Sequence, residues 1–203
     1  MSSRIVVACI WWGSILAAIV MTGCSSESGP AQGAAAVRAA YADVLRDSLR
    51  VRQDKARNRI WLLGLEDVRV YDAGSKRLVR QIALPGWSVA RFVCDPDMVL
   101  DGSGSAIVSS NVQARLWRID GDTFEVNERE ISLQERERWE VGFGALMFAA
   151  DGTLYALTST AGSLWKVDFA RASASMVEPS KPPSKTCVFT AQFLRDIGRS
   201  RKP

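Results

Sequence analysis

The chain has 203 residues, a net charge of +4 and no histidine. The lack of histidine removes the commonest general base, the commonest metal ligand and every Ser-His or Cys-His nucleophile pair. Basic and acidic residues are interspersed without a basic stripe, so we expect no nucleic-acid partner. Because the chain has no histidine, we also expect no metal, no cofactor and no catalytic residue.

The first 23 residues have the pattern of a secretory signal. An apolar run from Ile5 to Met21 follows one basic residue, Arg4. A basic tip, a short apolar stretch and small residues before a cleavage point predict a signal peptide over residues 1–23. An uncleaved helical anchor is the alternative, because the run is close to the minimum length that spans a bilayer.

The end of this run, Met21-Thr22-Gly23-Cys24, resembles the lipobox of bacterial lipoproteins, with Met21 where leucine is usual. The resemblance implies that Cys24 carries diacylglycerol and an N-acyl chain such as palmitate, which anchor the protein in a lipid bilayer. It also implies the periplasmic side of the outer membrane, because Ser25 rather than aspartate follows the cysteine. Residues 24–33, rich in Ser, Gly and Pro, are then a flexible tether.

Residues 34–48 are predicted to form a short amphipathic helix. Val37, Tyr41, Val44 and Leu45 fall at helical spacing, with charged residues between them. We expect this helix to cover an exposed face of the sheets that follow.

Residues 49–198 contain an internal repeat. Aspartate ends a short apolar strand at positions 72, 120 and 168, two steps of 48 residues, and a second series lies upstream at Asp54, Asp101 and Asp151. Asp-Gly pairs such as Asp101-Gly102 and Asp151-Gly152 predict tight turns. Each unit therefore contains four antiparallel strands.

The strands expected in each unit run from an inner apolar strand to a polar outer one. The inner strands are 49–51, 90–93 and 145–148, the second strands 60–63, 106–108 and 154–157, the third strands 68–72, 116–120 and 164–168, and the outer strands 77–84, 125–133 and 173–178. Four strands in about 48 residues is the period of a β-propeller blade.

Two stretches carry a family resemblance, Asp151-Gly152-Thr153-Leu154-Tyr155-Ala156-Leu157 and Gly162-Ser163-Leu164-Trp165-Lys166-Val167-Asp168. They resemble the repeats of bacterial β-propellers of the quinoprotein-like, NHL and YVTN types. The resemblance implies an all-β, propeller-like domain of about three four-stranded blades and no particular activity. A fourth blade is expected to begin at residues 187–194, after a proline-rich connector and before a basic tail at 199–203.

Three blades leave two outward sheet faces. We expect Trp61, Trp117 and Trp165 to fill one repeat position in the core between blades. The outward faces are expected to carry Trp61, Leu63 and Val70 at one end and Tyr155, Leu157 and Trp165 at the other. Apolar faces of this size require a cover, either the flanking segments, a second copy or a partner protein.

Two cysteines remain after the signal and the lipidated residue are set aside. Cys94 and Cys187 are a disulfide candidate in an oxidising compartment, and two buried thiols are the alternative. Each borders a similar apolar motif, and sequence alone does not show whether their Cα atoms approach.

These observations favour a membrane-anchored periplasmic lipoprotein that acts as a non-catalytic binding or scaffold module, with a protein partner or self-association. Two alternatives stay open: a propeller-type enzyme, quinoprotein- or lactonase-like, and a truncated remnant without activity. The enzyme alternative would need polar groups that converge from many blades of a closed ring.

Overall fold

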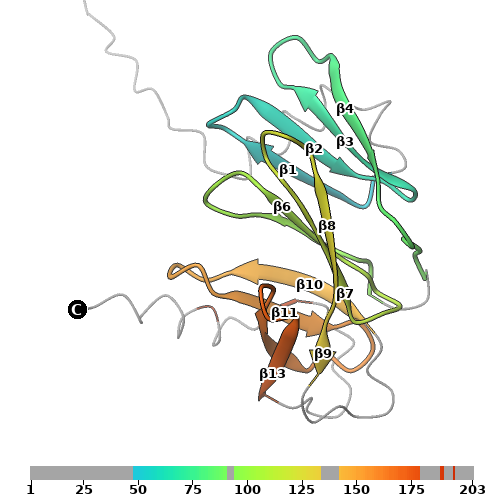
Figure 1. Cartoon of the computed structure of the whole chain (residues 1–203), viewed down its shortest axis with the longest axis vertical. Helices are drawn as coiled ribbons and strands as arrows, with labels where there is room; N and C mark the ends of the chain where they lie inside the picture. The colour runs from blue at the N-terminus through green and yellow to red at the C-terminus, as the bar shows by residue number, and fades with distance from the viewer. Residues whose placement is uncertain (1–47, 91–93, 134–141, 179–187, 190–193, 195–203) are drawn as a thin grey trace, which may run out of the picture. The chain divides into compact units, whose positions relative to one another are not determined.

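The computed structural model describes residues 48–90, 94–133, 142–178, 188, 189 and 194. The chain is all-β and propeller-like, with successive antiparallel sheets (Figure 1). The expected signal peptide, tether and basic tail lie outside the described residues. So does the predicted helix over residues 34–48, apart from Ser48, which has no regular secondary structure.

Three sheets follow one another along the chain. The first contains β1 (Arg50–Asp54), β2 (Arg59–Leu63), β3 (Asp67–Asp72) and β4 (Leu78–Ala83). The second contains β5 (Met98–Leu100), β6 (Ala106–Ser109), β7 (Arg115–Ile119) and β8 (Val126–Glu130). The third contains β10 (Phe143–Phe148), β11 (Leu154–Thr158), β12 (Leu164–Asp168), β13 (Ser173–Glu178) and the short β9 (Ser132–Leu133). In the first two sheets all four strands pair in sequence order, and in the third sheet β10 to β13 do so, as the repeat predicts.

Aspartate side chains shape the turns between the third and fourth strands. Asp72, Asp120 and Asp168 each accept a hydrogen bond from the backbone N–H three residues later, at 2.6, 2.8 and 2.9 Å. Four residues after each aspartate the backbone takes a positive φ, at Lys76 (59°), Phe124 (62°) and Ala172 (51°). The three turns are therefore one structure repeated at 48-residue steps.

The inner strand of the second sheet differs from the prediction. The expected strand at 90–93 is not the inner strand: Ala90 has no strand structure, residues 91–93 lie outside the described residues, and β5 occupies Met98–Leu100. The reason is the position of the turn at Asp101. The inner strand of each sheet ends where this turn begins, as β1 ends at Asp54 in the first sheet.

The outer strand predicted at 125–133 is broken. At Ile131 the chain leaves the second sheet, with the Ile131 N–H bonded to the Ala114 carbonyl at 2.6 Å. The next two residues form β9, which pairs in parallel with β13 at Ser132–Ser173 (Figure 1). β9 thus covers the edge strand of the third sheet and ties the second sheet to it, which reduces the hazard of an exposed edge.

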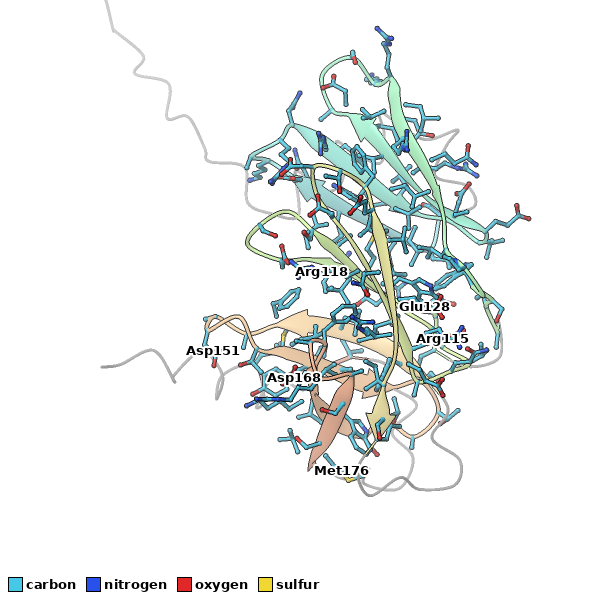
Figure 2. The ribbon with its side chains drawn as sticks, in the orientation of Figure 1. Arg115, Arg118, Glu128, Asp151, Asp168 and Met176 are labelled. Atoms are coloured by element: carbon cyan, nitrogen blue, oxygen red, sulfur yellow. The ribbon has the colours of Figure 1, made fainter. Side chains whose placement is uncertain are left out.

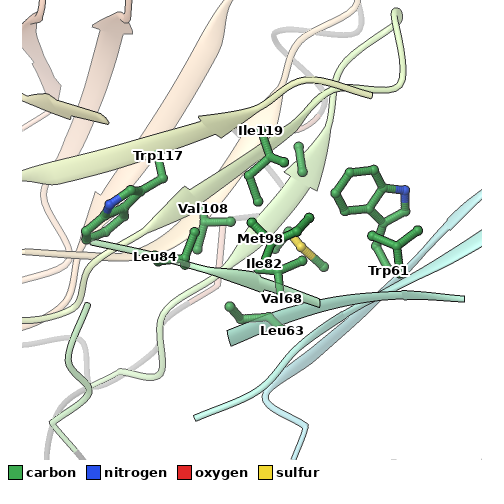
Figure 3. Close-up of a cluster of buried hydrophobic side chains, with 11 residues drawn as sticks. Trp61, Leu63, Val68, Ile82, Leu84, Met98, Val108, Trp117 and Ile119 are labelled. Atoms are coloured by element: carbon green, nitrogen blue, oxygen red, sulfur yellow. The ribbon is translucent and has the colours of Figure 1, made fainter. Parts of the chain in front are cut away.

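The core between the first two sheets is built from both of their facing sides (Figure 3). Trp61, Leu63 and Val70 are fully buried against Trp117 and Ile119. The expectation that Trp61, Leu63 and Val70 form an outward face is therefore wrong. The opposite face of the first sheet carries Ile60 and Leu62, because successive side chains of a strand alternate between the two faces.

A second core joins the second and third sheets. Ile107 and Leu116 pack with Leu154 and Trp165, so the placement of Trp165 on an outward face is also wrong. All three tryptophans lie in cores between sheets, as expected, yet they do not share one repeat position: Trp61 lies on β2, whereas Trp117 and Trp165 lie on β7 and β12.

The outward face of the third sheet carries Leu157 and Tyr155, as predicted, together with Ala145 and Leu164. Phe189 packs against this cluster. The strand expected at 187–194 is not seen at its described positions, because Phe189 has no strand structure and Leu194 is helical; the other residues of that segment lie outside the described residues.

Candidate functional site

The sequence singled out Cys24, Cys94 and Cys187. Cys94 is disulfide-bonded in the structure. The other cysteines lie outside the described residues, so the pairing with Cys187 and the lipidation of Cys24 stay predictions.

Cys94 lies against the inner edge of the third sheet. Its N–H donates to the Ser159 carbonyl at 3.2 Å, and the Asn111 side chain donates to its carbonyl at 3.0 Å. A Cβ at Gly144 would lie 2.4 Å from the Cβ of Cys94, so only glycine fits there. The disulfide is therefore held at a tightly packed junction of the second and third sheets.

Asp97 connects the inner strands of all three sheets. One of its carboxylate oxygens accepts from Arg50 Nε at 3.2 Å, Arg52 Nη2 at 2.8 Å and the Met98 N–H at 2.8 Å. The other accepts from the Leu146 N–H at 3.1 Å. Its side chain is only 10 % exposed. With four accepted hydrogen bonds, three of them on one oxygen, Asp97 holds the inner strands of the sheets together.

At the turn edge of the first two sheets, Arg57 is clamped between two carboxylates. Its Nε and Nη2 donate to the two oxygens of Asp122 at 2.8 and 3.0 Å, and its Nη1 donates to Asp54 at 3.4 Å. The hydrogen bond to Asp122 raises the pKa of Arg57, and the same bond lowers the pKa of Asp122. This boundary is closed by the chain's own charges.

An aromatic contact fills the space beside this clamp. The rings of Trp61 and Phe124 lie 5.9 Å apart, and the Arg59 guanidinium lies over the Phe124 ring at 4.9 Å. Arg59 also donates to the Gly121 carbonyl. Aromatic and cation–π contacts together leave a closely packed boundary.

The corresponding boundary between the second and third sheets contains a groove of about 270 Å³. Ile107 and Arg118 line it from the second sheet, and Phe148, Leu154 and Phe169 line it from the third. Figure 2 shows Arg118 on the second sheet and Asp151 and Asp168 on the third. The groove combines apolar walls with charged rims, as ligand sites commonly do.

Two cations line this groove, Lys166 on the third sheet and, on the second sheet, Arg118. Its Nη2 donates to Asp101 Oδ2 at 2.9 Å, and its side chain is 45 % exposed. The other oxygen of Asp101 is taken by the N–H groups of Ser103 and Ser105 at 2.9 and 3.0 Å. Since a guanidinium has five donors, Arg118 keeps several for a further acceptor.

The turn aspartates near the groove are held in their ionised form. The Arg171 backbone N–H lowers the pKa of Asp168, and the Thr153 backbone N–H lowers the pKa of Asp151. Hydrogen bonds to a carboxylate favour its charged state. These carboxylates accept hydrogen bonds from the backbone of their own turns, and they also add negative charge near the rim of the groove.

The described residues contain no group of three or more Cys, Asp or Glu side chains arranged to hold a metal ion. Nor does any helix in that part of the chain have the length and apolar character needed to cross a membrane. The groove places a partly paired cation, Arg118, next to apolar walls.

Sequence analysis missed Asp97 and Arg118. Asp97 lies outside the turn series, and nothing in its neighbours marks a residue that reaches three sheets. Arg118 had a signal: it lies two residues before a repeat aspartate, at the position that Val70 occupies in the first unit and fills with an apolar side chain.

No protein-family model matches the chain, and no curated protein sequence matches it. Among solved structures, the selenomethionine-substituted virginiamycin B lyase from Staphylococcus aureus is similar with a TM-score of 0.50 and 9 % identity. The match covers 68 % of this chain and 43 % of the lyase. This likeness supports the propeller-like fold alone.

Two further structures show weaker likeness. A protein of unknown function from Bacteroides thetaiotaomicron has a TM-score of 0.47 at 17 % identity, over 63 % of this chain and 34 % of that one. A catalytically inactive S. aureus virginiamycin B lyase with quinupristin has 0.48 at 12 % identity, over 66 % and 41 %. The chain thus spans less than half the length of each of these three solved proteins.

Proposed function

We propose that the protein is a lipid-anchored binding module of the bacterial envelope, and that acylated Cys24 anchors it to the periplasmic side of the outer membrane. The motif Met21-Thr22-Gly23-Cys24 supports the anchor. Several acyl chains on one cysteine hold a protein firmly, whereas one chain binds only marginally.

The groove between the second and third sheets carries the binding part of the proposal. Arg118 offers unused donors there, and Phe148 and Phe169 offer apolar surface. A chain without histidine lacks the commonest acid–base catalyst, so recognition suits this groove better than catalysis. The partner is a protein or a second copy of the chain.

Metabolic labelling with palmitate tests the anchor. We expect the wild type to incorporate label and Cys24→Ala to incorporate none and to accumulate as the precursor. Cys9→Ala, a substitution within the apolar run, is the matched control and should label normally. Label that survives Cys24→Ala would contradict the lipoprotein assignment.

Site-specific photo-crosslinking in cells tests the binding site. A crosslinking residue at Thr153, on the groove, should give a discrete adduct, and one at exposed Arg77 should not. The adduct should be lost when Arg118→Gln is added, and its mass separates a second copy from another protein. The same adduct from both positions, or its persistence with Arg118→Gln, would refute the groove as the binding site.

A further inference from the structure

The repeat allows the two boundaries between sheets to be compared position by position. Asp54 and Asp101 both open the turn after the inner strand, and each accepts backbone N–H groups of that turn. The residue two positions after the next repeat aspartate is Asp122 in the second sheet and Ala170 in the third, 48 residues later. These positions define corresponding sites.

At the first boundary an arginine has two carboxylates. Arg57 pairs with Asp54 and, through two parallel hydrogen bonds, with Asp122, and its side chain is 26 % exposed. Such a bidentate pair is the strong form of an arginine–carboxylate contact.

At the second boundary one of the two carboxylates is missing. Arg118 pairs with Asp101, the counterpart of Asp54. The counterpart of Asp122 is Ala170, which is exposed and has no carboxylate. Within the described residues Arg118 has a single ion-pair partner, and it is more exposed than Arg57.

The aromatic pair of Trp61 and Phe124 is not repeated at the corresponding positions of the second boundary. Trp61 pairs across strands with Val70, and its counterpart Ile107 pairs with Arg118. The residue that matches Phe124 is Ala172, which also has a positive φ (51° against 62°). Where two rings meet at a tilted angle at the first boundary, the second has an isoleucine and an alanine, beside a groove of about 270 Å³.

We infer that the groove binds a carboxylate attached to an aromatic or similar apolar group, with the carboxylate on Arg118 and the apolar group between Ile107 and the phenylalanines of the third sheet. The ligand replaces both elements that the first boundary supplies from its own chain. This inference rests on the proposal that the groove is the binding site, and it adds the chemistry of the ligand. A free aromatic acid and an acidic aromatic end of a peptide share this chemistry.

Ligand-observed NMR on the full chain in a neutral detergent tests the inference. Phenylacetate is the probe, and phenylacetamide is its uncharged match. For a probe of this size we expect a Kd on the order of 1–10 mM, with at least about tenfold weaker binding of the amide, as the loss of one charged hydrogen-bonded contact predicts.

Two pairs of variants locate the binding. Arg118→Gln should abolish it, while Arg129→Gln, an exposed arginine on β8, should not. Ala170→Asp restores the missing carboxylate and should also abolish binding, while Ala170→Asn should leave it intact. Both positions are exposed or partly exposed, so the variants should keep the fold.

The outcomes of these experiments distinguish a protein ligand from a small acid. They also distinguish failure of the inferred ligand chemistry from failure of the groove as the binding site. Tighter binding of an acetylated Gly-Phe peptide with a free carboxyl end than of phenylacetate assigns a protein partner, and the reverse assigns a small acid. Equal binding of acid and amide, or binding that survives Arg118→Gln, overturns the inference. If crosslinking at Thr153 depends on Arg118 while no acid binds, the inference fails and the proposed function stands.

Discussion

Asp97 is expected to be the most sensitive charged residue of the described fold, and Asp97→Ala tests this. The substitution removes four hydrogen bonds that join β1, β5 and β10. Two of the donors are the backbone N–H groups of Met98 and Leu146, both in buried contacts. A buried donor left without an acceptor costs roughly 1–3 kcal/mol.

The two arginines contribute less to the loss. Arg50 and Arg52 are 28 % and 36 % exposed, so water can solvate them after the carboxylate is gone. We therefore expect Asp97→Ala to lower the free energy of unfolding by about 3–5 kcal/mol, mainly through the backbone donors and the loss of a buried charge network.

Urea unfolding of the full chain, followed by tryptophan fluorescence, measures this change. Asp95→Ala is the matched control, because Asp95 is 51 % exposed and lies 3.8 Å from Arg50. Its cost should stay within about 0.5 kcal/mol. If Asp97→Ala costs less than about 1 kcal/mol, or no more than the control, the central role of Asp97 is refuted.

Three further predictions follow from single features. Denatured, unreduced protein should contain no free thiol at Cys94 or Cys187, and Cys187→Ser should expose Cys94 to alkylation and lower stability by about 2–4 kcal/mol; a free thiol at both would reject the bridge. Backbone hydrogen bonds lower the pKa of Asp120 in the folded state, so its stabilisation is complete above its unfolded pKa and lost as the pH falls through the lower folded value. Asp120→Asn should therefore flatten the loss of stability as the pH falls below the ordinary aspartate pKa of about 3.9, and an unchanged slope would contradict this. The indole N–H of Trp117 donates to a backbone carbonyl at 3.0 Å, whereas that of Trp165 has no hydrogen-bond partner among the described residues. Trp117→Phe should cost about 1 kcal/mol more than Trp165→Phe in thermal or urea unfolding, and the reverse order would be inconsistent with these contacts.

The repeat was predictable because its signals are local. Asp72, Asp120 and Asp168 shape their own turns through bonds to residues three positions away, so their spacing alone indicates where strands end. The three third strands, and the outer strands of the first and third sheets, accordingly lie close to their expected ranges. The inner strand of the second sheet was misplaced because an apolar run at 90–93 outweighed the rule that this strand must end at the turn aspartate.

The direction in which side chains face was harder to predict. Strand periodicity separates two faces, but in a stack of sheets both faces are apolar, so sequence does not show which one meets a neighbour. Trp61 was assigned to an outward face although it packs against the second sheet. Ile60, one residue away, is just as buried, and no polar residue marks the difference.

The groove illustrates why a site of this kind escapes sequence analysis. No residue in it forms a recognised motif, and Arg118 alone is an ordinary strand arginine. The site becomes visible only when Arg118 is compared with Arg57, which has the second carboxylate that Arg118 lacks. That comparison requires the folded structure, because Arg57 lies in the turn between β1 and β2 whereas Arg118 lies on β7, so the two arginines do not align in the repeat. Within a repeat protein, the repeated turns hold each sheet in the same arrangement. A binding site can then arise at one boundary between sheets that lacks packing contacts which the neighbouring boundary retains.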